Sequence, residues 1–207
     1  KARVERLGFF EPGEVIFNTI TREGQEDIVD VEISVKERST GTITLGAGYG
    51  SVQKFFVTTQ ISEINLLGRG QNLSFQAQYS TQDPRQRSFS LGFTDPYAFD
   101  TRWSMGGDIF SVQFVIPELY VMRRIGFNFR LGRPLTDDIN AFITYKLEEM
   151  TVIENPKGID TEPDEGILSS IIWSVVRDKR NNRFETTGGD YQRVSLETAG
   201  VGGKKRF

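Results

Sequence analysis

The sequence predicts a mainly β protein. Polar and apolar residues alternate through most of the chain, and clusters of Gly, Pro, Asn and Asp separate the alternating runs. From residue 41 onward, roughly nine runs of strand length follow one another, and no segment shows the 3.6-residue period of a helix. Short connections between successive runs favour an antiparallel meander.

Three segments alternate most cleanly. Residues 72–80, 88–94 and 124–132 place apolar side chains at every second position, with mostly Ser, Gln, Asn, Gly or Arg between them. Residues 56–62 and 141–149 follow the same pattern more loosely. We expect turns at residues 66–71, 81–86, 94–100, 133–138, 155–166 and 180–189.

The N-terminal residues show a different pattern. Residues 1–10 are spaced for a short helix that ends at Gly8. Residues 14–23 and 27–38 predict two strands joined by a turn at residues 24–26. About 38 residues can bury little surface alone, so we expect this segment to be the end of a larger module.

The composition excludes several kinds of function. The chain has 25 Lys and Arg residues against 28 Asp and Glu, and the net charge of -3 gives no electrostatic reason for nucleic-acid binding. Cysteine and histidine are absent, which excludes disulfides, thiolate metal sites and Ser-His-Asp catalysis. No pair of carboxylates is fixed by its spacing. We therefore predict that the protein is not an enzyme and assign no catalytic, cofactor-binding or metal-binding residue.

The stretch TLGAGYG places glycines at every second position, Gly46, Gly48 and Gly50. A dinucleotide-binding loop needs the spacing G-x-G-x-x-G before a helix, whereas a strand-like run follows here, so no phosphate site is predicted. Glycines two apart lie on one face of a strand. Two explanations are open: the small residues let the sheet bend or another segment approach closely, or the strand pairs weakly and is built to separate.

Two all-β architectures fit the alternation. In a soluble β-sandwich the apolar face forms the core, whereas in an outer-membrane β-barrel it contacts lipid and the polar face lines the lumen. A membrane helix is excluded, since the longest apolar run, residues 167–176, is about half of the roughly 20 residues required. Long consecutive strands, a polar face rich in Gly, Ser, Asn, Gln and Arg, and aromatic residues near strand ends favour the barrel. The aromatic residues are Tyr79, Tyr97, Phe99, Trp103, Tyr120 and Tyr191.

Several motifs resemble the BamA family of outer-membrane assembly factors. ERLGFF (residues 5–10) is similar to the second helix of the family's last POTRA domain, and VDVEISVKERSTGTITLGAGYGS (residues 29–51) is similar to that domain's last strand and the first barrel strand. INLLGRGQNLSF, FTDPYAFDTRWSMGGDIF and LGRPLTDDINAFITY resemble the first three periplasmic turns. RDKRNNRFETTGGDY resembles a later turn but departs from it at Asn181 and Thr186, where Asp and Pro are usual.

The resemblance implies a domain organisation. Residues 1–38 are expected to be the C-terminal part of a POTRA domain, and residues 39–207 the N-terminal half of an outer-membrane β-barrel that has sixteen strands in the family. The expected fold class is thus mainly β: a partial antiparallel transmembrane β-barrel of roughly nine strands, preceded by the C-terminal part of an α+β POTRA domain. The ending ETAGVGGKKRF resembles a mid-barrel strand and loop, so we expect the barrel to continue after it.

The resemblance also implies a function. The protein would be a component of the outer-membrane protein assembly machinery, in the bacterial outer membrane with its POTRA part in the periplasm. Its partners would be unfolded outer-membrane β-barrel clients, accessory lipoproteins of the assembly complex and membrane lipid, without a cofactor or nucleic acid. Clients would be folded and inserted through a weak lateral seam at the first barrel strand. This lateral-gate strand consists of Gly41, Thr42, Ile43, Thr44, Leu45, Gly46, Ala47, Gly48 and Tyr49.

Strand parity then predicts which connections face the periplasm. With the N-terminal end in the periplasm, the turns at 65–71, 95–101, 133–138 and 179–189 are periplasmic, and the connections near 51–54, 81–86, 115–120 and 153–166 are extracellular. Arg177 and Asp178 are expected to form an ion pair at their turn or to contact the POTRA domain. The periplasmic turn motifs comprise Leu67, Gly68, Gly70, Asp95, Pro96, Tyr97, Arg177, Asp178, Asn182 and Gly189.

Two other functions stay open from the sequence. A passive outer-membrane transporter or porin-like channel of the same superfamily would use Arg124, Arg130 and Lys146 in a polar lumen to tune selectivity. A soluble β-sandwich binding module would instead bury the apolar face in a core.

Overall fold

The structure is a computed structural model of the chain, and it describes residues 4, 7–11, 13–21, 29–81, 83, 86–117, 119–158, 165–181 and 186–202. The chain divides into two compact units, Lys1–Gly41 and Thr42–Phe207. Each unit is described by itself.

The first unit contains an antiparallel hairpin of β1 (Ile16–Thr21) and β2 (Val29–Ser34), as the sequence predicts. Gly8 has a positive φ of 73°, which suits the predicted end of a helix. The Arg38 guanidinium donates a hydrogen bond of 2.8 Å to the Gly8 carbonyl. Most of the predicted helix and the whole turn at residues 24–26 lie outside the described residues.

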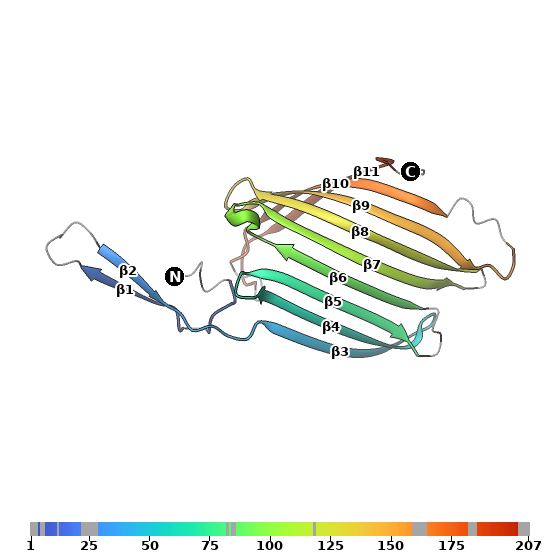
Figure 1. Cartoon of the computed structure of the whole chain (residues 1–207), viewed down its shortest axis with the longest axis horizontal. Coiled ribbons are helices and arrows are strands. Elements are labelled where there is room, and N and C mark those ends of the chain that lie inside the picture. Colours follow the sequence, from blue (N-terminus) through green and yellow to red (C-terminus); the bar gives the residue numbers. More distant parts are fainter. Residues whose placement is uncertain are drawn as a thin grey trace. The chain divides into compact units, whose positions relative to one another are not determined.

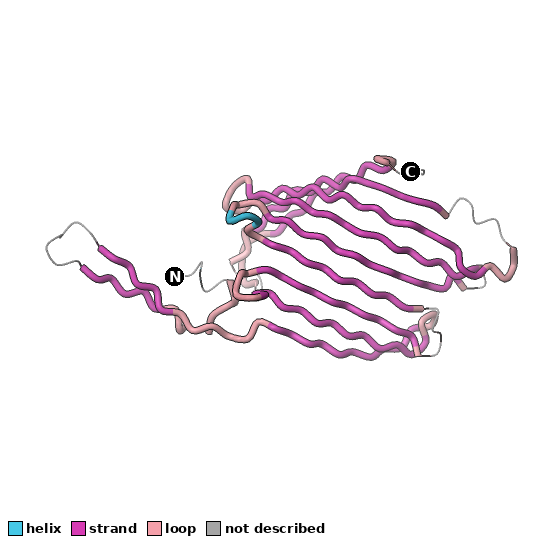
Figure 2. The backbone as a smooth tube through the Cα atoms, viewed as in Figure 1, coloured by secondary structure: helices cyan, strands magenta, loops and turns pink. Residues whose placement is uncertain are grey.

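The second unit is a nine-stranded antiparallel sheet in which every strand pairs with its neighbours in the sequence (Figure 1). The order from one edge to the other is β11-β10-β9-β8-β7-β6-β5-β4-β3, and Figure 2 shows how completely strands make up this unit. The predicted meander is therefore confirmed. The strands are β3 (Gly41–Gly50), β4 (Lys54–Leu66), β5 (Gln71–Ser80), β6 (Arg87–Asp95), β7 (Ser104–Ile116), β8 (Tyr120–Pro134), β9 (Ile139–Glu154), β10 (Gly166–Asp178) and β11 (Tyr191–Ala199).

One short helix interrupts this pattern, although the sequence predicts none after residue 41. It is the 3₁₀ turn η1 (Ala98–Asp100) between β6 and β7. The Asp95 carboxylate accepts a hydrogen bond of 2.9 Å from the Tyr97 amide, and Phe99 and Asp100 both have a φ of 56°. This local turn chemistry, which alternation does not report, produces the difference.

The register places apolar side chains from successive strands in rows on one face of the sheet. Leu91 pairs with Phe75 and Ile109, and Ile109 pairs with Phe127, which in turn pairs with Leu147. Residues one position away belong to the other face, which is largely polar: Asp108, Asn128 and Lys146 share a row there.

The apolar face is the more exposed of the two. Phe75, Ile109 and Phe127 are 36%, 60% and 40% exposed, whereas Glu148 and Ser174 on the polar face are 2% and 4% exposed. The sheet is curled, and its last strands pass behind the others in Figure 1. Side chains on a concave face converge and cover one another, so these exposures identify the polar face as the inner one. This is the arrangement of a membrane barrel rather than of a sandwich.

Close packing on the polar face leads to a testable prediction at Gly126. A Cβ atom there would lie 2.5 Å from the Leu147 carbonyl oxygen and 2.8 Å from the Phe110 ring. Because the carbonyl belongs to the backbone and cannot swing aside, Gly126→Ala is expected to lower the free energy of unfolding by about 1–3 kcal/mol. Urea titration of the intact protein in lipid vesicles measures this.

Gly188→Ala is the matched control. A Cβ atom at Gly188 meets no atom within 4 Å. We expect its stability to stay within about 0.5 kcal/mol of the parent. Equal stability of the two variants would contradict the close packing at Gly126.

Candidate functional site

Strand β3, which contains the whole predicted lateral-gate strand, lies at one edge of the sheet. It neighbours β4 on one side, and none of the described strands pairs with its other side. Ile43, Leu45 and Tyr49 are 71%, 74% and 72% exposed, against 36%, 60% and 40% for Phe75, Ile109 and Phe127 on the central strands of the sheet. An edge strand presents a row of unpaired N–H and C=O groups, so β3 offers a template for another strand.

The glycines of β3 make room for side chains of β4. A Cβ atom would lie 2.7 Å from the Thr58 hydroxyl at Gly46 and 2.6 Å from the Phe56 ring at Gly48. Close approach by a neighbour, the first of the two explanations drawn from the sequence, accounts for these positions. The same bare face leaves β3 few side-chain contacts of its own, so backbone pairing to β4 supplies most of its attachment.

The turn after β3 is tied to the next loop on the same end of the sheet. The Ser80 hydroxyl donates to the Gln53 carbonyl at 2.6 Å, and the Gln86 amide donates to the Val52 carbonyl at 2.9 Å. Ser80 and Gln86 are 1% and 7% exposed. These buried bonds hold the C-terminal end of β3, whereas its N-terminal end at Gly41 continues into the other unit.

The inner face carries a group of ion pairs across β7, β8 and β9. Arg130 pairs with Asp108 at 2.6 Å. Glu148 pairs with Arg124 at 2.6 Å and with Lys146 at 3.0 Å. Arg124, Arg130 and Lys146 are the three cations that a selective channel would need, and each of them is paired with a carboxylate here. Paired charges tie strands together and attract passing ions less than free ones.

Two predicted periplasmic turns are joined by a hydrogen bond. Leu67, Gly68 and Gly70 form the β4–β5 turn with φ values of 55°, 71° and 66°. The Gln71 side-chain amide donates to Asp95 at 2.8 Å, which connects this turn to the β6–β7 turn. Pro96 and Tyr97 follow Asp95 in that second turn, and Tyr97 is 58% exposed.

The β10–β11 turn corrects one expectation. Arg177 pairs with Asp190 at 3.2 Å, and Asp178 pairs with Arg180 at 2.8 Å, so the expected Arg177–Asp178 pair does not form. Adjacent residues at a strand end point to opposite faces, which separates the two side chains. Hydrogen bonding to Asp178 raises the pKa of Arg180 above its ordinary value.

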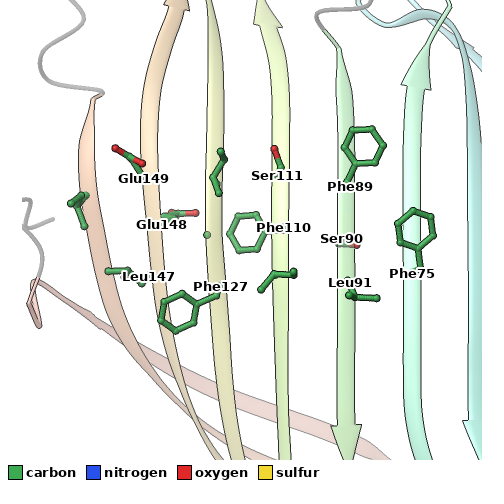
Figure 3. A pocket seen from close by; sticks show the side chains of 14 residues that line it. Phe75, Phe89, Ser90, Leu91, Phe110, Ser111, Phe127, Leu147, Glu148 and Glu149 are labelled. Atoms are coloured by element: carbon green, nitrogen blue, oxygen red, sulfur yellow. The ribbon is translucent and has the colours of Figure 1, made fainter. Parts of the chain in front are cut away.

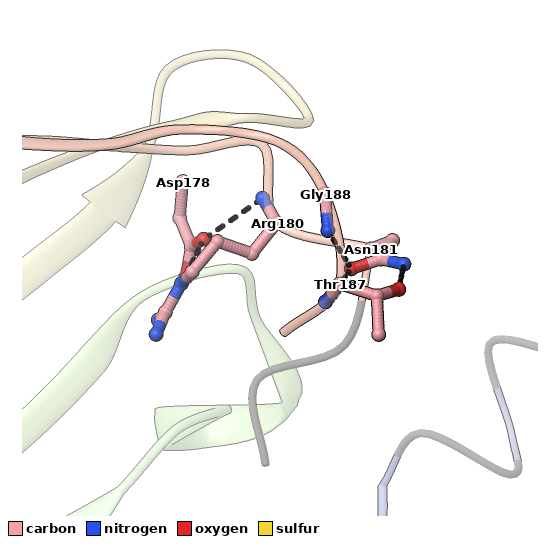
Figure 4. Close-up of polar contacts among 5 residues, drawn as sticks. All are labelled: Asp178, Arg180, Asn181, Thr187 and Gly188. Atoms are coloured by element: carbon pink, nitrogen blue, oxygen red, sulfur yellow. Dashed lines mark hydrogen bonds and ion pairs between the residues drawn. The ribbon is translucent and has the colours of Figure 1, made fainter. Parts of the chain in front are cut away.

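The same turn depends on Asn181 and Gly189. The Asn181 carbonyl oxygen accepts hydrogen bonds of 3.2 Å from the Thr187 and Gly188 amides, and its amide nitrogen donates to the Thr187 hydroxyl at 2.6 Å (Figure 4). Gly189 has a φ of 100°, a conformation that favours glycine. Asn182, another predicted motif residue, lies outside the described residues.

The outer face carries a shallow hollow of about 730 Å³ over the central strands. Figure 3 shows Phe75, Phe89, Leu91, Phe127 and Leu147 around it. The hollow has no cluster of polar groups that would orient a small ligand, so it is best described as part of the apolar surface.

The height of that apolar surface can be measured along β8. Arg123 and Arg133 lie on the same face as Ile125, Phe127, Phe129 and Leu131 and bracket them. Ten residues extend about 34 Å along a strand, and a tilt of about 40° reduces this to about 26 Å, against the roughly 25 Å apolar band of outer-membrane barrels. The Arg133 guanidinium also lies 5.2 Å from the Trp103 ring centroid, as in an interface girdle.

Other kinds of site are not found in the part of the chain that the structure describes. No group of three or more Asp or Glu residues there is placed to hold a metal ion. Within the same residues, no helix has the length and apolar character needed to cross a membrane.

Comparison with known proteins identifies the family. Residues 65–207 match the family model described as the Omp85 superfamily domain. The chain belongs to the Omp85 superfamily. The expected resemblance to its BamA branch is confirmed, because curated relatives with the name "Outer membrane protein assembly factor BamA" match most of the chain. They are named as assembly factors, which agrees with the prediction that this protein is not an enzyme.

Two such relatives and one solved structure define how far the similarity reaches. The relative from Neorickettsia risticii is 29% identical over 100% of this chain, which spans 28% of that protein. The relative from Neisseria meningitidis is 30% identical over 73% of this chain and 19% of its own length. The crystal structure of BamA from Haemophilus ducreyi lacking POTRA domains 1-3 has a TM-score of 0.71 at 22% identity and matches 98% of this chain and 42% of its own.

The structure also brings together residues that sequence reasoning did not single out. Asp108 and Glu148 hold the inner-face cations, and Ser80 and Gln86 hold the turn after β3. For Asp108 and Glu148, the one signal in the sequence is that they occupy polar positions of the alternating pattern. No local signal marks the second pair, because the partners are backbone carbonyls about thirty residues away.

Substitution of Glu148 or Glu149, which are adjacent in β9 and lie on opposite faces, tests the role of the inner-face ion pairs. Glu148→Gln leaves Arg124 and Lys146, which are 35% and 22% exposed, without their carboxylate. Because these cations are partly solvated, we expect a loss of about 2 kcal/mol of stability, less than the 3–5 kcal/mol of a fully buried pair. Urea unfolding of the intact protein in vesicles measures the loss.

Glu149→Gln is the control, because Glu149 is exposed on the other face. Because Glu149 lies on the apolar face near the end of the band, removal of its charge should leave the stability unchanged or raise it by up to about 1 kcal/mol. A Glu148→Gln variant as stable as this control would show that the pairs contribute nothing to the fold.

Asn181 gives a second test at this site. Asn181→Asp retains the oxygen that accepts the Thr187 and Gly188 amides, so we expect the turn to keep its structure. Asn181→Ala removes that acceptor and should cost about 1 kcal/mol locally, which is roughly fivefold faster amide exchange at Gly188. Hydrogen-exchange mass spectrometry of the β10–β11 peptide measures both variants. If Asn181→Ala exchanges like the parent, the turn is held by other contacts.

Proposed function

We propose that the protein belongs to the machinery that folds β-barrel proteins and inserts them into the bacterial outer membrane, and that β3 is the strand that accepts a client. The observation that carries the proposal is the glycine face of β3, which β11 at the other edge lacks, within a sheet whose apolar face is turned outward. The names of the BamA relatives support the assembly role and the outer membrane as the location.

Physical chemistry supports an edge strand as the acceptor. An unpaired strand edge in lipid costs several kcal/mol for each unsatisfied N–H or C=O group, so it accepts an incoming strand readily. The hydrogen-bond ladder does not depend on side-chain identity, which suits a protein with many different clients. No nucleotide is required, because moving the apolar surface of a client into lipid is favourable.

The weakness of the seam follows from the same strand. The bare glycine face leaves β3 with few side-chain contacts of its own, so a partner on its free side is held mainly by backbone hydrogen bonds. In the whole protein this partner is the last barrel strand or the client, and the two compete for one edge.

The first unit fits the end of a POTRA domain. Its hairpin leaves Ile20, Val31 and Ile33 52%, 56% and 50% exposed, and a complete domain would cover such side chains. We therefore propose residues 1–38 as the end of a POTRA domain in the periplasm and residues 39–207 as part of the barrel. Unfolded barrel proteins and accessory lipoproteins of the assembly complex are the proposed partners.

A selective channel is the weaker alternative. Its three candidate cations are paired with Asp108 and Glu148, so they are poorly suited to select ions.

Cysteine crosslinking in the intact protein tests the proposal. The chain contains no natural cysteine, so single cysteines at Thr42 and Thr44 are the only thiols it supplies. We expect them to form disulfides with cysteines in the terminal strand of a stalled client, with the register advancing by two residues at each step. Non-reducing gels measure the yield.

Cysteines at Ser90 and Asn128, in central strands on the same inner face, are the matched controls. They should give no register-dependent product, because both edges of their strands are already paired. Equal yields of disulfide-linked client at β3 and at the controls would contradict the proposal that β3 is the acceptor.

A further inference from the structure

One register row crosses the outer face at the end of the apolar band opposite to Arg133. Arg87 on β6 pairs with Gln113 on β7, which pairs with Arg123 on β8. Tyr79 on β5 and Thr151 on β9 extend the row on either side. The two arginines are two strands apart, about 10 Å between their backbones.

Neither arginine is neutralised by a carboxylate. Both are exposed, and neither has an ion-pair partner among the residues that the structure describes. The Arg87 Nε donates a hydrogen bond of 3.3 Å to the Gln113 side-chain carbonyl, a neutral acceptor that orients the guanidinium. On the inner face, by contrast, Arg124 and Arg130 are paired with acids. Two acids lie one row away from Arg123 by register on this face, Glu149 opposite Ile125 and Glu154 opposite Val121.

The position of the row indicates what the arginines contact. They stand immediately beyond Phe89 and Ile125, where the apolar band ends and the headgroups of a surrounding leaflet begin. Guanidinium groups bind phosphate through paired N–H donors, and their aliphatic stems extend along apolar surface. A water-soluble phosphate would gain nothing from the adjacent apolar band, whereas a lipid phosphate contacts both.

We propose that Arg87 and Arg123 bind the phosphate groups of lipids in the leaflet at the end of the sheet that carries residues 81–86. With the N-terminal end of the barrel in the periplasm, this is the outer leaflet of the outer membrane, so the assignment of the leaflet rests on the proposed function. Phosphate binding here would fix the height of β6–β8 in the membrane.

Lipid binding by the intact protein in neutral detergent micelles tests this inference. The probe is spin-labelled phosphatidic acid, with spin-labelled phosphatidylcholine as the reference, and the immobilised fraction gives a dissociation constant. Arg87→Gln and Arg123→Gln should each weaken phosphatidic acid binding about fivefold, the equivalent of about 1 kcal/mol per basic residue, and the double variant about 25-fold. Arg123→Lys should retain most of the binding, and added salt should reduce the difference between parent and double variant.

Arg69→Gln is the matched control, because Arg69 is an exposed arginine in the β4–β5 turn at the other end of the sheet. It should bind phosphatidic acid like the parent. The inference is wrong if the double variant also binds like the parent, if Arg69→Gln weakens binding equally, or if inorganic phosphate at the same concentration displaces the lipid. Near-parent circular dichroism of each variant establishes that it is folded.

These outcomes are separate from those of the client experiment. If the double variant binds lipid like the parent while clients still crosslink specifically to β3, only the proposed phosphate site is refuted. A nitroxide at Phe127 that reports water in vesicles would remove the membrane-facing surface on which both proposals depend.

Discussion

The requirement that every backbone polar group find a partner controls this structure. Lipid offers no hydrogen-bond partner, so the backbone N–H and C=O groups of a sheet that faces lipid must pair with those of neighbouring strands. In this chain the ladder ends at β3 and β11. The central strands are fixed by two ladders and by side chains on both faces, whereas β3 has one ladder and a glycine face. The same hydrogen-bonding rule thus fixes the central strands and leaves one side of β3 without a partner among the described strands.

The two faces divide the remaining work. On the outer face, apolar residues are more exposed than the polar residues beside them in the sequence, the reverse of a soluble sheet. On the inner face, the acids Asp108 and Glu148 form ion pairs with three cations and connect β7, β8 and β9. Charge pairing on one side and lipid contact on the other allow a single layer of strands to stand without a second layer packed against it.

Much of the fold follows from the sequence, because alternation is a local property. Residues 72–80, 88–94 and 124–132 fall inside β5, β6 and β8 as predicted. The pairings are harder to predict, since a partner twenty or more residues away depends on the length and shape of each turn. Turn shape also decides the partner of Arg177: Asp190, 13 residues away, reaches it only after the β10–β11 turn closes, so the predicted pair with Asp178 is wrong. The row that contains Arg87, Gln113 and Arg123 likewise could not be predicted, because only the strand register brings the two arginines close together.

The buried bonds from Ser80 and Gln86 to the turn after β3 have a mechanical consequence. A strand that is held at one end separates from its neighbour first at the other end. We therefore expect thermal fraying of β3 to start near Gly41 and to stop before Gly50. A client that pairs with β3, as proposed, would therefore begin to pair near Gly41 and proceed toward Gly50.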